Sequence, residues 1–186
     1  CPHASPRLAS PPTASRGPWV MGCSSSAVDS SSTAEVFLPL RHAESKLLQS
    51  LPEVQAVDTV IEFQGQKVSI HSLELPAMSS NSGGSPSSAP LLFLPGYGTG
   101  AAIWLGLWKY WRSQGLVQRP LIAVDLLGMF LSSRLPWNPG VDVTKAEAWF
   151  AESLAAWCRA RNLLHFDLLG HSLGATVAVA LLERLS

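Results

Sequence analysis

Residues 166–174 read FDLLGHSLG, and this stretch decides how the rest of the chain is interpreted. A short apolar run, typical of a buried strand, leads into GHSLG at 170–174, and the apolar segment 175–185 that follows is typical of a helix. A serine flanked by glycines at a strand-to-helix turn matches the nucleophile-elbow pattern G-x-S-x-G. Ser172 is therefore the candidate catalytic nucleophile.

The residues beside Ser172 have steric and electrostatic roles in such a turn. Side chains at Gly170 and Gly174 would collide with the sharply bent backbone. The turn places the serine at a helix N-terminus, whose dipole favours negative charge on a substrate, so the backbone N–H of Leu173 is the expected oxyanion donor. The His171 side chain should point away from the serine. A glycine-rich turn that only enters a helix is the alternative, and the flanking strand and helix disfavour it.

A second glycine-rich loop, PGYGTG at 95–100, follows the apolar run 91–94. In folds that contain a nucleophile elbow, a loop after an early strand supplies the second oxyanion donor. We assign this donor to the backbone N–H of Tyr97. Gly96 and Gly98 would let the backbone approach a ligand closely. A phosphate-binding loop is the alternative, but the Lys and Ser/Thr of that motif are missing.

The order of the remaining segments predicts the architecture. Apolar strands that alternate with helices indicate an α/β fold, with a mostly parallel sheet flanked by helices and preceded by a hairpin. The expected strands span residues 59–63, 67–75, 91–94, 121–124 and 166–169, and the expected helices span 35–51, 101–114, 144–161 and 173–185. In the helix 144–161, Trp149, Phe150 and Trp157 share one face and should be buried. Thr144 and Glu147 have the spacing of a capping box at its start.

Composition limits the classes of partner. The 186 residues include 13 Lys plus Arg and 13 Asp plus Glu, a balance that gives no indication of a nucleic-acid partner. Three scattered cysteines indicate neither a disulfide framework nor a metal site, and we expect no cofactor. Residues 1–34 are rich in Ser, Pro and Ala and should be disordered, which leaves 35–186 as the folded domain.

No complete catalytic triad can be assigned within the sequence. A serine nucleophile needs an acid and a histidine base, which follow the serine in that order in the elbow fold. Residues 173–186 contain neither His nor Asp, so we expect both beyond Ser186 and interpret the chain as an N-terminal portion of its fold. Asp125, after the strand 121–124, should order the following turn. The portion alone should be inactive, with the elbow strand as an exposed sheet edge.

From about Phe37 to Ser186 the chain resembles the α/β-hydrolase-domain protein 4/5 subfamily. The resemblance rests on LLFLPGYGTG at 91–100, VDLLGMFLSSR at 124–134 and AEAWFAESLAAWCRARNLLHFDLLGHSLG at 146–174. It implies the α/β-hydrolase fold and a serine hydrolase or acyltransferase that forms an acyl-enzyme from acyl esters of phospholipids or lysophospholipids. A non-catalytic lipid-surface scaffold or lipase co-activator is the alternative. The chain departs from the subfamily at Pro95, where His is usual, and at Phe130, where a second turn glycine is usual.

The first methionine begins the run MGCSSS at 21–26, which fits an N-myristoylation pattern. If translation starts there, Gly22 is the candidate for myristoylation and Cys23 for palmitoylation, and two chains would anchor the protein stably. The resulting expectation is a cytoplasmic protein held at a membrane or lipid-droplet surface. An internal low-complexity segment and an organelle transit peptide are the alternatives.

Overall fold

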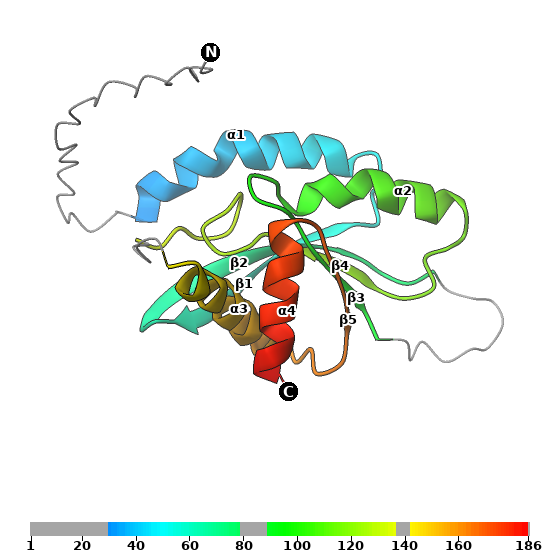
Figure 1. The fold of residues 1–186 in the computed structure, drawn as a ribbon. Helices are drawn as coiled ribbons and strands as arrows, with labels where there is room; N and C mark the ends of the chain where they lie inside the picture. The colour runs from blue at the N-terminus through cyan, green and yellow to red at the C-terminus, as the bar shows by residue number, and fades with distance from the viewer. Residues whose placement is uncertain (1–29, 79–88, 137–141, 186) are drawn as a thin grey trace, which may run out of the picture.

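The computed structural model describes residues 30–78, 89–136 and 142–185 (Figure 1). The lipidation candidates Gly22 and Cys23 lie outside the described residues. Within the described ranges, no helix combines the length and apolar character needed to cross a membrane.

A mixed sheet of five strands forms the centre of the fold. Its spatial order is β1-β2-β4-β3-β5. Antiparallel pairing joins β1 to β2 and β2 to β4, whereas β3 pairs in parallel with β4 and with β5. The strand bounds are β1 Gln55–Phe63, β2 Gln66–Leu75, β3 Leu91–Leu94, β4 Leu121–Val124 and β5 Asp167–Gly170. The predicted hairpin and three later strands are confirmed, and β5 lies at an edge of the described sheet, as expected.

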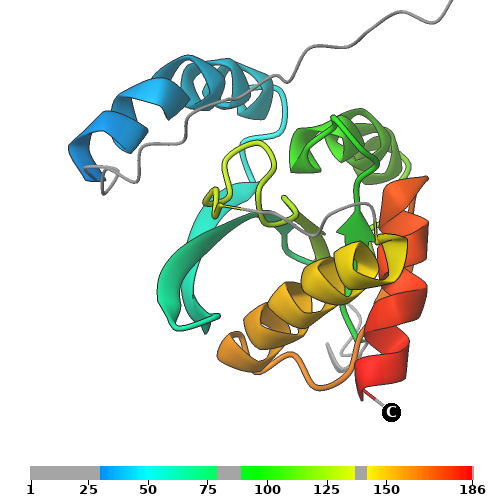
Figure 2. The same ribbon diagram turned by 60° about the vertical axis from the view of Figure 1, so that its left-hand side comes forward.

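Helices cover both faces of this sheet. Helices α3 and α4 pack side by side on one face, and η1 and α2 pack on the other (Figures 1 and 2). The helix bounds are α1 Ser30–Leu48, η1 Ala101–Trp104, α2 Leu105–Ser113, α3 Val143–Ala160 and α4 Leu173–Leu185. The α/β class with helices on both faces is therefore confirmed.

Alternation along the strands divides the core into two layers. In β3, Leu92 and Leu94 belong to the cluster beneath α3 and α4, whereas Leu91 and Phe93 belong to the cluster beneath α2. Successive side chains of a strand point to opposite faces, so a strand covered on both sides must be apolar throughout. All four residues of β3 are buried, as this rule requires.

The hairpin between β1 and β2 turns on two residues with left-handed backbones. Phe63 pairs with Gln66, and between them Gln64 has φ 51° and Gly65 has φ 74°. Positive φ at both central positions is the signature of the two-residue turn whose twist matches the strands. Glycine carries no steric cost in this conformation, which explains its place here.

Helix α3 confirms the predicted buried face and corrects the predicted cap. Trp149, Phe150 and Trp157 are 7%, 4% and 0% exposed. The helix begins earlier than expected, because the Asp142 side chain accepts a hydrogen bond from the backbone N–H of Lys145 at 3.1 Å. The proposed capping box of Thr144 and Glu147 is therefore wrong: an N-cap residue must precede the first helical turn, and 144 already lies within it.

Helix α1 is confirmed but is longer than predicted. It begins at Ser30, so the expectation of disorder is wrong for residues 30–34. The helix extends over these residues because each residue added to an existing helix contributes a further backbone hydrogen bond. Leu47 is 52% exposed, whereas Leu48 packs against the core. Two polar contacts hold α1 to the hairpin: Arg41 to Asp58 at 2.9 Å and Glu44 to His71 at 3.1 Å.

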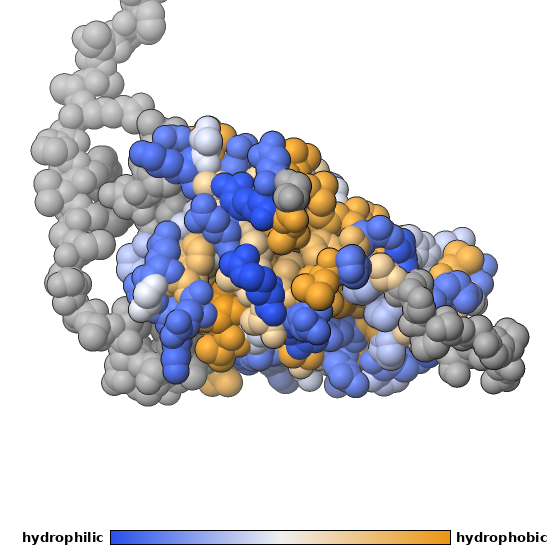
Figure 3. Space-filling model, turned by 90° about the horizontal axis from the view of Figure 1, so that it is seen from below, coloured by the Kyte–Doolittle hydropathy of each residue, from blue (hydrophilic) through white to orange (hydrophobic). Residues whose placement is uncertain are grey.

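Apolar side chains also reach the surface. Viewed from below, hydrophobic residues gather in the middle of the molecule among hydrophilic ones (Figure 3). On helix α4, Val179, Leu182 and Leu185 are 61%, 56% and 43% exposed. The outer side of α4 is thus more apolar than a helix facing only water usually is.

Candidate active site

The chain turns sharply between β5 and α4, and Ser172 is at the centre of this turn. Its φ is 52°, in the left-handed region, which a residue other than glycine adopts at a cost of roughly 1–2 kcal/mol. The serine carbonyl accepts the backbone N–H of Ala175 at 2.9 Å, which starts α4. Ser172 itself is exposed. The structure thus presents this hydroxyl to solvent on a strained turn at a helix N-terminus.

Both flanking glycines are sterically required. A β carbon at Gly170 would lie 2.6 Å from the Cα of Ala175, and one at Gly174 would lie 2.2 Å from the carbonyl oxygen of Leu94. Backbone atoms on each side make these clashes, so no rotation of a side chain could relieve them. The steric reason given for the two glycines from sequence therefore agrees with the geometry.

The loop after β3 lies directly against the serine. A β carbon at Gly96 would be 3.3 Å from the Cβ of Ser172 and 2.9 Å from Nδ1 of His171. The backbone N–H and side-chain hydroxyl of Thr99 both donate to the Gly96 carbonyl, at 3.2 and 2.9 Å, and close a turn around Tyr97 and Gly98. Gly98 has φ 70°, as the third position of a type II turn demands. Leu173 opens α4, so its N–H lacks an intrahelical partner.

A buried carboxylate forms hydrogen bonds to the backbone just after this loop. Asp125 is 1% exposed and accepts the backbone N–H of Ala101 at 2.6 Å and that of Leu131 at 2.9 Å. Burial raises the pKa of Asp125 above its usual range, although both hydrogen bonds oppose the shift. Asp125 therefore orders the turn that follows β4, as predicted, and also ties that turn to the start of η1.

The turn after β4 holds Phe130 in an unusual backbone conformation. Phe130 has φ 44°, at the position where the resemblance led us to expect glycine, and Gly128 nearby has φ 82°. The Phe130 ring fills the space beside Gly100, where a β carbon would lie 2.6 Å from its Cγ. The departure from the expected glycine is accommodated because Gly100 leaves room for the ring.

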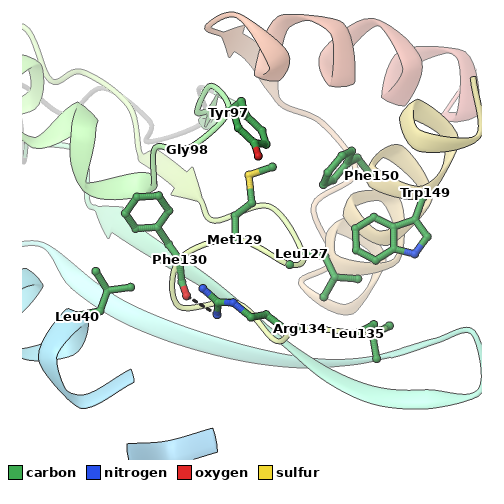
Figure 4. Close-up of a pocket in the computed structure, with 11 residues that line it drawn as sticks. Leu40, Tyr97, Gly98, Leu127, Met129, Phe130, Arg134, Leu135, Trp149 and Phe150 are labelled. Carbon is green, nitrogen blue, oxygen red and sulfur yellow. Dashed lines mark hydrogen bonds between the residues drawn. The ribbon is translucent and has the colours of Figure 1, made fainter. Parts of the chain in front are cut away.

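An apolar cleft of about 590 Å³ opens beside the same loop. Its walls come from four parts of the chain: α1, the loop after β3, the turn after β4 and the start of α3 (Figure 4). Tyr97 and Gly98 lie at one end, and Leu40 of α1 lies at another. Ser172 is not among the residues that line the cleft, but Gly96, whose backbone passes close to Ser172, directly precedes Tyr97 and Gly98. The same loop therefore passes close to the serine at Gly96 and lines the cleft at Tyr97 and Gly98.

Comparison with known proteins agrees with this geometry. A model of the alpha/beta hydrolase fold family matches residues 89–185, which include both the loop and the elbow. The chain belongs to the α/β-hydrolase fold family. The expected likeness to the 4/5 subfamily is confirmed too: the chain is 36% identical over 141 residues to 1-acylglycerol-3-phosphate O-acyltransferase ABHD5 of Sus scrofa. That match covers 76% of this chain and 36% of the relative, so the chain spans about a third of the relative's length.

Two further similarities support the assignment. A 1-acylglycerol-3-phosphate O-acyltransferase of Arabidopsis thaliana is 47% identical over 58 residues, covering 31% of this chain and 14% of that protein. Among solved structures, a bacterial membrane phospholipase A superposes with a TM-score of 0.53 at 23% identity, covering 81% of this chain and 41% of that one. At this identity the superposition establishes the fold alone.

The described part of this α/β-hydrolase fold supplies no base to Ser172. Within it, the buried His71 bonds to Asp58 and Glu44, and the buried Asp125 accepts from backbone N–H groups, so none of these hydrogen bonds involves the serine hydroxyl. His171 and His165 are both exposed. Cys158 is no alternative nucleophile, because burial raises the pKa of its thiol to about 12. Among the described residues, no cluster of His, Cys, Asp or Glu could hold a metal ion.

Sequence reasoning missed one polar cluster in this hydrolase fold. His71 on β2 is fully buried, with Nδ1 2.7 Å from Asp58 and Nε2 3.1 Å from both carboxylate oxygens of Glu44. Burial lowers the pKa of His71, but Glu44, Asp58 and the nearby charge of Asp125 outweigh it and raise the pKa above its ordinary value. The available signal was a histidine inside an otherwise apolar strand. The cluster joins α1 to the sheet and does not contact Ser172.

Proposed function

We propose that this protein is a serine hydrolase or acyltransferase that acts on acyl esters of phospholipids or lysophospholipids through Ser172. The observation that carries the proposal is the left-handed backbone of Ser172, φ 52°, between two glycines that tolerate no side chain. Strain of this kind persists only where the surrounding structure enforces it, and it is concentrated at functional sites.

The chemistry follows from the position of the serine. The Ser172 oxygen attacks the acyl carbonyl carbon while a base removes the hydroxyl proton, and the carbonyl oxygen becomes an oxyanion. The backbone N–H groups of Leu173 and Tyr97 are the proposed donors to that oxyanion. Collapse breaks the ester bond, the departing alcohol takes the proton, and the acyl group remains on Ser172. Water or the hydroxyl of a lysophospholipid then attacks the acyl-enzyme and releases the serine.

The base and its acid partner are assigned to parts of the protein outside the described residues. Without a base the serine hydroxyl is a weak nucleophile, whatever the oxyanion donors contribute. The relatives are longer than this chain, since it spans 36% of the length of ABHD5 from Sus scrofa. We therefore expect Ser172 to be reactive only where such a base is present.

The substrate class rests on the relatives and on the cleft. Relatives from a mammal and a plant carry the name 1-acylglycerol-3-phosphate O-acyltransferase, which describes acyl transfer to a phospholipid precursor. The cleft beside the loop is lined mainly by apolar side chains and lies within the ~300–1,000 Å³ typical of ligand sites. An acyl chain is the ligand that such walls accommodate without unpaired polar groups.

The test uses a fluorophosphonate probe that labels activated serines. Full-length protein should react, Ser172→Ala should lose all labelling, and Ser113→Ala should label like the wild type, because Ser113 is an exposed serine at the end of α2. Equal labelling of Ser172→Ala would contradict the nucleophile assignment. A folded wild-type protein that never labels, yet binds lipid vesicles, would instead support the non-catalytic scaffold or co-activator.

A further inference from the structure

The apolar cleft contains one charged side chain among the described residues that line it, and this is Arg134. Its Nη1 donates a hydrogen bond to the carbonyl of Phe130 at 2.9 Å (Figure 4). Its guanidinium carbon lies 4.5 Å from the ring centre of Phe37. The carbonyl and the ring hold the guanidinium in place from two sides. An arginine held in this way loses little conformational freedom when it binds a ligand.

No described carboxylate lies within ion-pair distance of Arg134. Five other described arginines each have such a partner: Arg41 with Asp58, Arg112 with Glu53, Arg119 with Asp167, Arg161 with Glu74, and Arg184 with Glu152. Guanidinium carries five N–H donors, and the bond to Phe130 uses one of them. Arg134 is exposed, and it therefore brings to the apolar cleft a positive charge with no described ion-pair partner, together with unused donors.

We propose that Arg134 binds the phosphate group of a lysophospholipid whose acyl chain occupies the cleft. Leu127, Met129 and Phe150 are among the apolar residues that would contact the chain. The guanidinium fork matches phosphate oxygens in paired hydrogen bonds. A phosphate monoester, with close to two negative charges at neutral pH, is favoured over a diester with one. This inference concerns binding alone. It rests on the proposed function only in that the bound lipid is named as the substrate.

The position of the cleft explains why such a ligand would matter to Ser172. The loop from Gly96 to Gly98 approaches the serine at Gly96, where a β carbon would lie 3.3 Å from the Cβ of Ser172, and lines the cleft through Tyr97 and Gly98. A lipid held by its phosphate at Arg134 would therefore lie against the loop that carries a proposed oxyanion donor. Arg134 is a specificity-determining residue in this arrangement, and it does not touch the reacting atoms.

The experiment measures binding in full-length protein that carries Ser172→Ala, so that turnover does not interfere. Three ligands separate the parts of the interaction: a lysophosphatidic acid, the monoacylglycerol with the same acyl chain, and glycerol 3-phosphate. The lysophosphatidic acid should bind most tightly. Adding Arg134→Gln should weaken its binding about tenfold, the effect of losing a charge-assisted hydrogen bond, and leave monoacylglycerol binding unchanged. Arg134→Lys should retain part of the preference.

A matched control removes a positive charge elsewhere. Arg159→Gln, at the exposed end of α3, should leave the preference for lysophosphatidic acid unchanged. The inference is overturned if Arg134→Gln binds lysophosphatidic acid as tightly as its parent, or loses monoacylglycerol binding equally. It is also overturned if glycerol 3-phosphate binds as tightly as the lipid. Because no chemistry is measured, these outcomes are independent of the labelling test of Ser172.

Discussion

Gly174 at the start of α4 lies against Leu94 at the end of β3, so that a β carbon on the glycine would be 2.2 Å from the leucine carbonyl oxygen. This approach brings the elbow onto the neighbouring parallel strand. The backbone N–H of His171 donates to the same carbonyl at 3.0 Å. A single carbonyl group thus both anchors the elbow and excludes every residue other than glycine at 174.

The first prediction concerns this close approach. Gly174→Ala should lower the free energy of unfolding by at least about 2–3 kcal/mol, because the added carbon must displace backbone rather than a side chain. The matched control is Gly106→Ala, inside α2, where a β carbon would meet nothing within 4 Å. That change should stabilise the protein by roughly 0.5–1 kcal/mol. Urea denaturation of the full-length variants measures both, and equal effects would contradict the steric argument.

The second prediction separates stability from reactivity at Ser172. Glycine adopts φ 52° without a steric cost, so Ser172→Gly should be more stable than Ser172→Ala by roughly 1 kcal/mol. Both variants should lose probe labelling. Thermal denaturation distinguishes them, and a Ser172→Gly protein no more stable than Ser172→Ala would show that the turn is not strained.

The third prediction is a pH dependence that arises from His71. Its pKa is raised above the ordinary 6.5, so its ion pairs with Glu44 and Asp58 stabilise the fold fully below about pH 6.5 and are lost as pH rises through the folded pKa. His71→Gln should cost roughly 3 kcal/mol near pH 6, the low end for a buried charge left unpaired, and less at higher pH. The pKa of Asp58 is lowered, since its bonds to His71 and Arg41 outweigh burial, so its contribution falls only in acid.

A control for this pH dependence is available on α1. His42 is exposed, so His42→Gln should change stability little at any pH. Chemical denaturation at a series of pH values gives the comparison. A cost for His71→Gln that does not vary between pH 6 and pH 9 would mean that His71 stabilises the fold as a neutral hydrogen-bonding group.

The fourth prediction tests the corrected cap of α3. Asp142→Ala should cost about 1 kcal/mol, because the first helical N–H groups lose their acceptor. Thr144→Ala should cost less than about 0.5 kcal/mol, since Thr144 is exposed and lies within the first turn. Thermal denaturation of the two variants ranks them directly. The reverse order would restore the capping box of Thr144 and Glu147.

Several features followed from short stretches of sequence because local geometry dictates them. The strand, glycines and helix around Ser172 are adjacent in the chain, and their spacing allows only a sharp turn. The buried face of α3 was readable for the same reason, since helical periodicity alone puts Trp149, Phe150 and Trp157 on one side. The cap of α3 was misplaced because both Asp142 and Thr144 are favourable cap residues, and only the backbone distinguishes them.

Tertiary structure alone decided which distant groups meet. His71 lies 27 positions from Glu44 and 13 from Asp58, and no periodicity links residues on a helix, a strand and a hairpin partner. The cleft likewise combines α1, two loops and α3, so the one charged side chain among its described lining residues, Arg134, had no visible significance in the sequence. Hydrophobic patterning specifies which face of each element is buried, but the packing of those faces against one another determines which polar side chains are brought together.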